Sequence, residues 1–493
     1  MADINKLFDT INKSMGRTIV SNILDVKAIA PLATCRMDTG SVAINTITGG
    51  GIPKGYVTEY VGHESSGKTS LALMQAGITT RNGGHVAFID IEGGFKTDQS
   101  IEYLQRFGIV LDHFHLVVPK WKEEAIDAVE ALIVSKQIEL IIYDSIAADL
   151  ASRQVDREAS DKGVGIEAKL NTLLLKKVKS SMQPLNLNDP DDKPWCAFIF
   201  TNQLRDVIGM SGPMQSQPKG AGGWALKHLK DISIEFKRTH YLGPNGEEVN
   251  TTSSETKSDK DMIYGQTIKL MVRKNKTWFP FIVTTVDYYF KERMDGIVKQ
   301  NGIDSGKEIF TLGNVYNTFD KCGTQVFFNI KTANWFQLDD VNKNKTPIFD
   351  ETRIKEKVVA LGISDEEKQK MEEDIKNLQY PLYTKDGLDI SKIDNNAQLK
   401  AAFMKGQINL MYSFIKSSSL KETTEILATN EAVRKIEIEK IYDLAINQKK
   451  TELLFDNEVK QSVIAEEALE AKVLNNKGSN TLFTKQSTPV AED

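Results

Sequence analysis

A complete phosphate-binding loop constrains this chain more than any other feature of its sequence. Residues 62–69 read Gly-His-Glu-Ser-Ser-Gly-Lys-Thr, which is the GxxxxGK[ST] pattern. An apolar, strand-like stretch at 56–61 precedes the loop, and a helix-like stretch at 70–76 follows it. Strand, loop and helix in this order are the context that the pattern requires. A chance glycine-rich turn is the alternative, but all four fixed positions are present, and we expect the chain to bind a nucleoside triphosphate.

The chemistry of such a loop assigns a task to its residues. The glycines let several N–H groups point at one anion, and the N-terminus of the next helix adds its positive dipole. We expect the Lys68 ammonium to reach the β- and γ-phosphates of ATP and the Thr69 hydroxyl to ligate Mg²⁺. The predicted ATP-binding residues of this segment are Gly62, Glu64, Ser65, Ser66, Gly67, Lys68, Thr69 and Ser70.

Length and composition limit the classes of protein that the chain can belong to. Its 493 residues exceed one ordinary core, and we expect two or three domains. The net charge of −5 is unlike that of a protein that only coats nucleic acid, so binding to DNA would need a local basic surface. Three scattered cysteines fit a reducing compartment, and no secretory signal or membrane-length apolar run stands out. These features predict a cytoplasmic protein with no membrane partner.

Strand-like and helix-like stretches alternate between about residues 40 and 300. This alternation predicts an α/β core with a central, mostly parallel sheet flanked by helices. Apolar residues at helical spacing also predict a short N-terminal helix over 3–15. The expected strands are 56–61, 85–90, 140–144, 197–202, 231–237 and 267–272, and the expected helices are 70–80, 98–107, 122–136 and 166–182.

The chain changes character beyond about residue 305. Residues 308–340 read as short strands with turns, and the chain is charged and helical from about 364, with capping boxes at Ser364 and Ser419. The domains that we expect are an N-terminal helix and linker for subunit assembly (1–37), a nucleotide-binding core (38–300), a small mixed α/β extension (301–363), a largely helical C-terminal region (364–474) and a disordered tail (475–493).

Two further strand-like runs end in carboxylates. Asp144 ends the apolar run that begins at Leu140, and Glu92 follows the run at 87–91. Ligands of open α/β sheets bind at the carboxyl ends of the strands, and we therefore expect Asp144 to hold Mg²⁺ directly or through water. Glu92 is the candidate for orienting the water that attacks the γ-phosphate. Spacing alone leaves open that Glu92 is only a solvated acid at a strand end.

Six segments, in one order along the chain, closely resemble RecA-type homologous recombinases, including the UvsX-like enzymes of bacteriophages. The resemblance covers about residues 38–300, and the Glu-Ser-Ser-Gly-Lys-Thr form of the phosphate loop is unusually specific for that family. It does not extend to the C-terminal third. The matching segments are 38–41, 49–55, 62–69, 88–92, 142–145 and 201–205.

The resemblance implies a role for each matching residue. Glu92 matches the family's catalytic glutamate, Tyr103 an aromatic that stacks on adenine, and Gln203 a glutamine that senses the γ-phosphate. Lys274 and Lys276 match two lysines that reach across a subunit interface to a neighbour's ATP, as an arginine finger does elsewhere. A half-buried helix tyrosine, an edge-strand glutamine and a solvated basic strand end are the plain alternatives. The catalytic set implied is Lys68, Glu92, Gln203, Lys274 and Lys276.

Two loops match the family's mobile DNA-binding loops, at about 155–165 and 204–222. Both contain glycine and carry Val, Ile or Met at their tips, which suits wedging between bases, while basic residues take phosphates. Ordinary surface loops are the alternative, although loops of this length inside a compact domain are more often functional. The implied DNA-binding residues are Arg157, Lys162, Gly163, Val164, Gly165, Lys169, Arg205, Val207, Ile208, Met210, Lys219, Gly220, Gly222, Gly223, Trp224 and Lys227.

The chain departs from the family pattern in three places. Trp224 stands where the family usually has Asn, which affects the base-facing surface, and His228 stands where it usually has Phe. The second departure puts the family's usual contact between subunits in doubt. The segment from Glu92 to Tyr103 is also longer than usual and contains two glycines.

The resemblance implies a DNA-dependent ATPase that forms filaments on single-stranded DNA and catalyses homologous pairing and strand exchange in recombination and repair. It implies ATP and Mg²⁺ as cofactors. The implied partners are single- and double-stranded DNA, further copies of the chain in a helical filament, and single-strand-binding and loader proteins. A ring-forming motor of the replicative helicase kind, or a regulatory assembly ATPase, remains the alternative. The loop pair anchored by Gln203 and the lysine pair favour the recombinase.

Overall fold

The computed structural model describes most of the chain up to residue 322 and parts of the remainder. The described residues are 2–27, 35–148, 163–205, 219–220, 223–249, 262–322, 325–329, 336–338, 345–347, 382–384, 408–410, 414–417 and 419–448. No helix among them is long and apolar enough to cross a bilayer.

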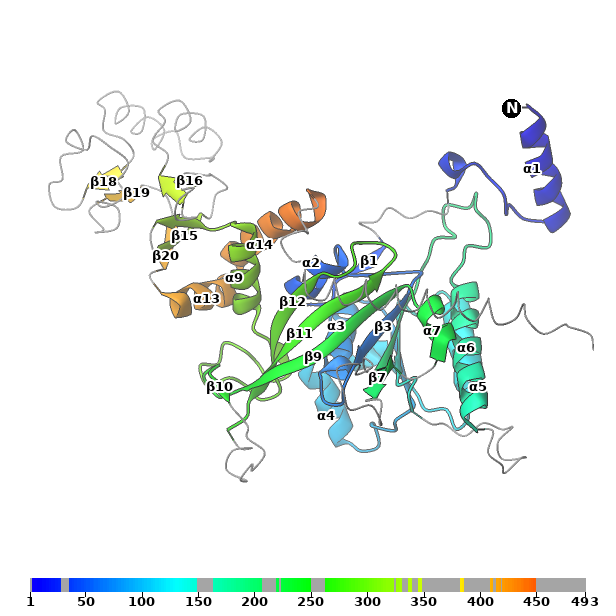
Figure 1. Ribbon diagram of the computed structural model, residues 1–493, viewed down its shortest axis with the longest axis horizontal. Helices are drawn as coiled ribbons and strands as arrows, with labels where there is room; N and C mark the ends of the chain where they lie inside the picture. Colours follow the sequence, from blue (N-terminus) through cyan, green and yellow to red (C-terminus); the bar gives the residue numbers. More distant parts are fainter. Residues whose placement is uncertain are drawn as a thin grey trace, which may run out of the picture.

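One large mixed sheet forms the centre of the molecule (Figure 1). Its parallel part contains β9 (Ile232–Leu242), β3 (Val57–Gly62), β7 (Ala197–Arg205), β6 (Leu140–Asp144), β4 (Val86–Asp90) and β5 (Phe114–Val117), in that order. Beyond β9 it continues antiparallel through β11 (Gly265–Asn275), β12 (Val283–Tyr289) and β13 (Gly302–Ile303). The six strands expected from the sequence are all present, and the predicted fold class is confirmed.

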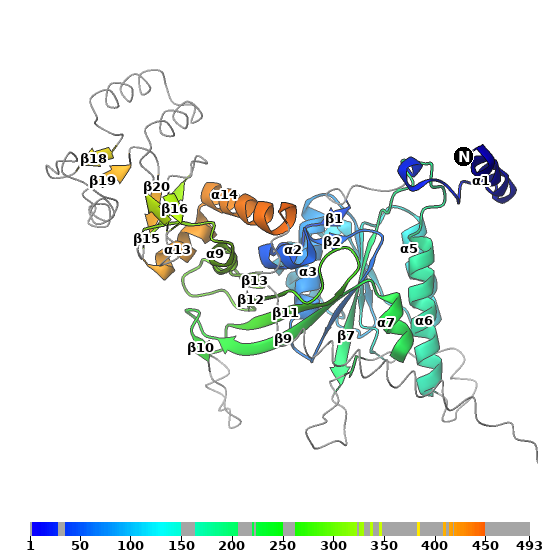
Figure 2. The ribbon, with the colours of Figure 1, turned by 45° about the horizontal axis from the view of Figure 1, so that its top comes forward.

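Helices cover both faces of this sheet, on opposite sides in Figure 2. On one face lie α2 (Val42–Thr48), α3 (Lys68–Arg81) and α4 (Gln99–Arg106). The other carries α5 (Lys122–Val134), α6 (Gly163–Ser181) and α7 (Gly223–Leu229). The strands point alternate residues into the two cores: Phe88 and Ile142 face the first, and Ala87 and Ile141 face the second. Runs of apolar residues in these strands follow from burial on both faces.

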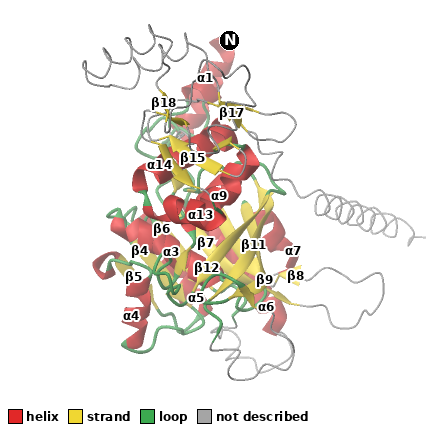
Figure 3. Cartoon of the chain, turned by 90° about the vertical axis from the view of Figure 1, so that its left-hand side faces the viewer, coloured by secondary structure: helices red, strands yellow, loops and turns green. Residues whose placement is uncertain are grey.

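A smaller C-terminal unit is built on α9 (Ser305–Tyr316), which is a helix where the sequence predicted strands from residue 308. Asp304 caps this helix by accepting from the Lys307 N–H. An aspartate before a helix is a start signal, and the sequence-based prediction of strands overlooked it. The remaining elements are β14 (Asp320–Cys322), β15 (Gln325–Asn329), β20 (Phe414–Ser417), α13 (Leu420–Thr429), α14 (Glu431–Tyr442) and η5 (Asp443–Asn447). Figure 3 shows α9, α13 and α14 gathered above the large sheet.

The three-stranded sheet of this unit joins segments far apart in the chain, because β15 pairs with β20. The chain between β15 and β20 contains two short antiparallel pairs. These are β16 (Phe336–Leu338) with β17 (Lys345–Pro347), and β18 (Leu382–Thr384) with β19 (Ile408–Leu410). Ser419 accepts from the Glu422 N–H at 3.2 Å and caps α13 as predicted, whereas Ser364 lies outside the described residues.

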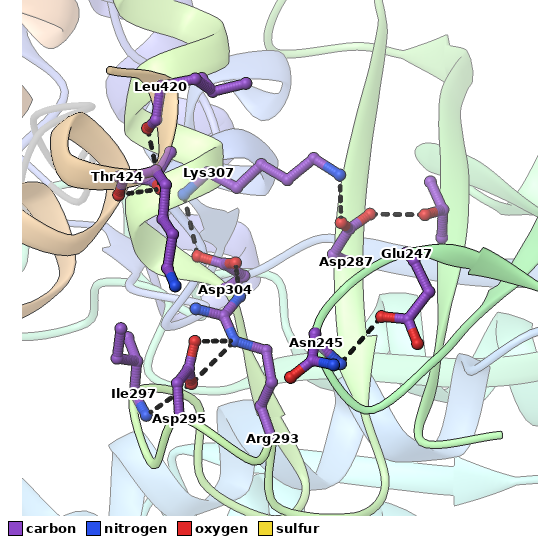
Figure 4. A network of polar contacts seen from close by, with 12 residues as sticks. Asn245, Glu247, Asp287, Arg293, Asp295, Ile297, Asp304, Lys307, Leu420 and Thr424 are labelled. Carbon is purple, nitrogen blue, oxygen red and sulfur yellow. Dashed lines mark hydrogen bonds and ion pairs between the residues drawn. The ribbon is translucent and has the colours of Figure 1, made fainter. Parts of the chain in front are cut away.

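Ion pairs and buried polar contacts hold the C-terminal unit against the core. Lys307 of α9 pairs with Asp287 of β12, and Arg293 bridges Asp295 and Asp304 (Figure 4). Asn45 of α2 donates to the Tyr442 hydroxyl of α14 at 3.1 Å. Residues far apart in the chain therefore belong to one packed structure around α2 and α9.

The N-terminal helix α1 (Ala2–Met15) forms as predicted. The segment after it lies along the loop that precedes β7. Leu187 N–H donates to Thr18 O at 3.0 Å, and Lys27 N–H donates to Leu187 O at 2.9 Å. Much of α1 itself remains exposed, including Ile4 and Leu7.

Candidate functional site

The carboxyl ends of four neighbouring parallel strands bring the predicted nucleotide residues together. Gly62 of β3 lies in register with Gln203 of β7, and Asp90 of β4 lies in register with Asp144 of β6. The strands stand side by side in the order β3, β7, β6, β4. Four stretches that are distant in sequence thus converge on one edge of the sheet, which is the edge where open α/β sheets bind ligands.

The phosphate loop has the backbone that an anion site needs. Ser65 and Gly67 have φ values of 58° and 92°, in the left-handed region. A Cβ at Gly67 would also lie 2.6 Å from the end of the Ile268 side chain, which would have to shift, so both the conformation and the packing favour glycine there. Gly67 gives α3 no side-chain cap. The first N–H groups of α3 are therefore available for phosphate oxygens.

The Lys68 side chain bends back toward the start of the phosphate loop. Its Nζ donates to His63 O at 2.7 Å and to Gly62 O at 3.1 Å. Burial lowers the pKa of Lys68, although the nearby Asp144, Glu92 and Glu64 carboxylates oppose the shift. The ammonium is thus held within the loop, in a surrounding where a phosphate would favour its charged form.

Thr69 and Asp144 form a pair of oxygen ligands suited to Mg²⁺. The Thr69 hydroxyl donates to Asp144 Oδ2 at 2.8 Å, and the Thr201 hydroxyl donates to the other carboxylate oxygen. Burial raises the pKa of Asp144, while these two hydroxyls oppose the shift. Mg²⁺ usually takes one or two protein oxygens together with substrate phosphates and water. The donor set fits that ion, and no group of three metal-ligating side chains stands elsewhere in the described residues.

Glu92 lies beside this pair and is held by a hydrogen bond. The Ser145 hydroxyl donates to Glu92 Oε1 at 2.6 Å. Just after β4, the Asp90 carboxylate accepts from the N–H groups of Gly93, Gly94 and Phe95, at 2.7, 3.0 and 3.1 Å. This turn explains how the glycine-containing segment after Glu92 is organised.

Tyr103 lies on α4, half-buried, with its ring edge-on to Phe107 at 5.1 Å. Burial raises the pKa of Tyr103, and the nearby Ser70 side chain, in the first turn of α3, opposes the shift. The ring therefore stands next to the phosphate loop, where an adenine could stack on it.

Lys274 and Lys276 lie in a different part of the subunit. Lys274 donates to Lys227 O at 2.8 Å, at the end of α7, and Lys276 donates to Asp231 Oδ1 at 2.7 Å. Asp231 is bonded to Val57, the first residue of β3, whereas the phosphate loop begins at Gly62, the last residue of that strand. The structure thus separates the lysine pair from the nucleotide residues of the same chain.

The structure describes only the ends of the predicted DNA loops. Gly163, Val164 and Gly165 belong to α6, which begins at Gly163, and this corrects the end of the first loop from 165 to 162. In the second loop, Arg205 of β7 lies opposite Lys219 of β8 (Lys219–Gly220), and Leu204 lies opposite Gly220. The two described ends of the second loop are therefore paired with each other.

The structure describes only some of the residues that were predicted to bind DNA. Lys169 on α6 and Lys227 on α7 are exposed, as is His228. Gly223 and Trp224 begin α7. Arg157, Lys162, Val207, Ile208, Met210 and Gly222 lie outside the described residues.

Sequence reasoning missed four residues that support the site. Ser145 orients Glu92, Thr201 orients Asp144, and Asp90 organises the turn after β4. Asp231 holds Lys276. Ser145 and Asp90 adjoin the predicted strand ends and could have been suspected there. Nothing in the local sequence indicates the partners of Thr201 or Asp231.

A family model and individual known proteins both show similarity of this chain to RecA. The chain matches the family model for the RecA N-terminal domain over residues 2–295. Protein RecA of Sulfurimonas denitrificans is 30% identical over 396 residues, which cover 78% of this chain and 95% of that protein. Protein RecA of Staphylococcus aureus (strain JH9) is 30% identical over 388 residues, which cover 76% of this chain and 98% of that protein.

Proposed function

From the premise that this chain belongs to the RecA family, we propose that it is a DNA-dependent ATPase that forms filaments on single-stranded DNA and exchanges strands. The family places it among proteins of recombination and DNA repair. The assembly, the strand exchange and the role of each site residue are our proposal. We infer that it acts in the cytoplasm on single- and double-stranded DNA.

The separation of Lys274 and Lys276 from the phosphate loop of their own subunit carries the proposal. Phosphoryl transfer needs positive charge where negative charge develops on the γ-phosphate. Lys68 supplies one such charge in each subunit, and the charges that act most strongly on it are three carboxylates. A second subunit that presents its lysine pair would complete the site. This arrangement makes hydrolysis dependent on assembly, as a filament requires.

The residues at the strand ends have different roles in the proposed hydrolysis. Mg²⁺, when bound with ATP, neutralises phosphate charge, and Thr69 with Asp144 would hold it. Glu92, fixed by Ser145, orients the attacking water. Gln203 lies in register with Gly62, on the strand that leads into the second DNA loop. A shift of Gln203 toward the phosphate would therefore be transmitted along β7 to that loop.

ATP hydrolysis with and without single-stranded DNA tests the activity, and electron microscopy of the same samples tests the assembly. We expect turnover that rises with protein concentration and DNA length, together with helical filaments. A closed ring that unwinds forked DNA would instead indicate a motor. Turnover that is insensitive to DNA would indicate a regulatory assembly ATPase.

A mixing experiment tests whether the site is shared. Lys274→Ala should abolish turnover while leaving ATP binding to the single subunit intact, and Glu92→Gln should keep ATP binding but hydrolyse far more slowly. Where the first variant supplies Glu92 and the second supplies the lysines, one complete site exists. A mixture that co-assembles but stays as inactive as its components would refute the shared site.

A further inference from the structure

We propose that Asp231 is a positioning residue for the lysine pair: it holds Lys276, and with it Lys274, in the orientation in which a subunit presents them to its neighbour's ATP. The inference rests on the proposed function, since it concerns the same shared site. Asp231 belongs to none of the predicted motifs, and only the tertiary structure relates it to the lysines.

Asp231 is itself held firmly. It is 3% exposed and directly precedes β9. Its N–H donates to Val57 O at 2.9 Å, and its Oδ2 accepts from the Val57 N–H at 3.1 Å. Two hydrogen bonds to the first residue of β3 therefore tie this carboxylate to the strand that leads into the phosphate loop.

Asp231 holds Lys276 at both the main chain and the side chain. The Lys276 N–H donates to Asp231 O at 3.1 Å, and its Nζ donates to Asp231 Oδ1 at 2.7 Å. A free lysine side chain loses much rotamer entropy when it is immobilised. Because Asp231 has already restricted this one, less of that entropy remains to be lost when a phosphate binds. An ammonium has three donors, and a single bond to Asp231 leaves two of them for phosphate oxygens.

A second lysine keeps the carboxylate paired. Lys179 of α6 donates to Asp231 Oδ1 at 2.6 Å and to Leu229 O at 3.1 Å. Should Lys276 shift toward a phosphate, Lys179 and the Val57 N–H would still satisfy Asp231. The move would therefore not leave a bare buried charge, which is strongly unfavourable.

Asp231 also counters repulsion within the lysine cluster. Lys274 faces Lys276, Lys230 and Lys179, and its pKa is lowered by burial first and then by these ammonium groups, with Asp231 as the opposing charge. Lys276 faces Asp231, Lys179 and Tyr56, and its pKa is raised, chiefly by the bond to Asp231. Removing the carboxylate would lower the pKa of both lysines and favour their separation.

The cluster also touches the helix that follows the second DNA loop. Lys274 donates to Lys227 O and Lys179 donates to Leu229 O, so both ammonium groups lie at the C-terminal end of α7. Cations are stabilised at that end of a helix. The lysine pair is thereby linked to α7 in two ways, directly through Lys274 and, for Lys276, through Asp231 and Lys179.

The test is Asp231→Asn, which is nearly isosteric and removes the charge. At saturating ATP and DNA, we expect kcat to fall by about tenfold or more, which corresponds to loss of a charge-assisted hydrogen bond, with the ATP Kd of the single subunit unchanged. Turnover requires charged lysines, so the alkaline limb of the pH–kcat profile should move to lower pH. Asp231→Glu should keep the limb near its wild-type position.

Asp287→Asn is the matched control, because Asp287 is another buried strand carboxylate paired with one lysine, Lys307. It should leave the alkaline limb in place. An unchanged kcat and pH profile for Asp231→Asn would overturn the proposal. Should that variant fail to bind ATP, Asp231→Glu takes its place in the mixing experiment below, because it keeps the charge but moves the carboxylate by one methylene and should therefore lower kcat without moving the alkaline limb.

Mixing with Glu92→Gln separates this proposal from the proposed function. The Asp231→Asn chain retains Glu92, and the partner chain supplies correctly held lysines, so the mixture should regain turnover. Rescue of Lys274→Ala but not of Asp231→Asn would overturn the role of Asp231 while leaving the shared site standing. Failure to rescue either variant, with co-assembly confirmed, would refute the shared site itself and this role with it.

Discussion

Replacing Ser145 by alanine tests how far the geometry of the candidate site controls hydrolysis. Ser145 is 1% exposed, and its hydroxyl donates to Glu92 Oε1 at 2.6 Å. Alanine removes one oxygen atom and leaves the fold around it unchanged. Glu92 would keep its charge but lose the donor that orients it, so ATP should still bind while the attacking water is positioned poorly.

The strength of the Ser145–Glu92 hydrogen bond sets the size of the expected effect on kcat. A hydrogen bond to a charged group contributes about 1.5–3 kcal/mol, and about 1.4 kcal/mol in the activation free energy is a factor of ten in rate. If that interaction is needed only in the transition state, kcat should fall by about 10-fold to about 150-fold.

The assay is single-turnover and steady-state ATP hydrolysis on single-stranded DNA, with the ATP Kd measured separately. Ser135→Ala is the matched control, because Ser135 is exposed and its hydroxyl, which donates to Leu132 O and accepts from the Gln137 N–H, lies at the end of α5. A Ser145→Ala enzyme with wild-type kcat would refute the orienting role. A loss of ATP affinity that accounts for the whole defect would refute it equally.

Three further predictions concern the phosphate loop, the second DNA loop and the packing of the C-terminal unit. Lys68→Ala should abolish ATP binding or turnover, because the phosphate charge loses its ammonium, and unchanged hydrolysis would exclude this loop as the active site. Deleting residues 210–219 should weaken binding to single-stranded DNA and flatten its salt dependence, as measured by fluorescence anisotropy, and intact affinity would exclude the loop. Burial raises the pKa of Glu308 to about 8, far above the 4.5 usual for glutamate. Native Glu308 therefore stays protonated where the unfolded chain is ionised, and its contribution to stability falls as pH rises from about 4.5 to about 8. The urea midpoint of unfolding should therefore decrease less over this pH range in Glu308→Gln than in the wild type. An identical dependence of the midpoint on pH in the two proteins would contradict a raised pKa at Glu308.

Local sequence predicted the nucleotide residues well because each lies in a short pattern with a direct physical meaning. The phosphate loop requires glycine at positive φ, which Gly67 shows at 92°. Asp144 was expected at the end of a buried strand, and β6 ends at that residue. Alternation of strands and helices also indicated the parallel sheet, because residues buried on both faces give nearly continuous apolar runs.

Prediction was weaker where helix signals competed with strand signals. Residues 308–316 read as strands, yet they belong to α9, which Asp304 caps and which packs on α2 and α13. The first DNA loop was drawn three residues too long, since α6 begins at Gly163. Boundaries depend on tertiary packing as well as on local propensity.

The sequence by itself determined that this chain binds a nucleotide on an α/β sheet, since the phosphate loop and the strand-end carboxylates carry that information locally. Tertiary structure decided which side chains meet. Sheet order places Gln203 beside Gly62, the path between strands brings Ser145 to Glu92, and the packing of α6, α7 and β11 brings Lys179 and Lys276 to Asp231. Such contacts join residues that are tens of positions apart, and no local pattern in the chain specifies them.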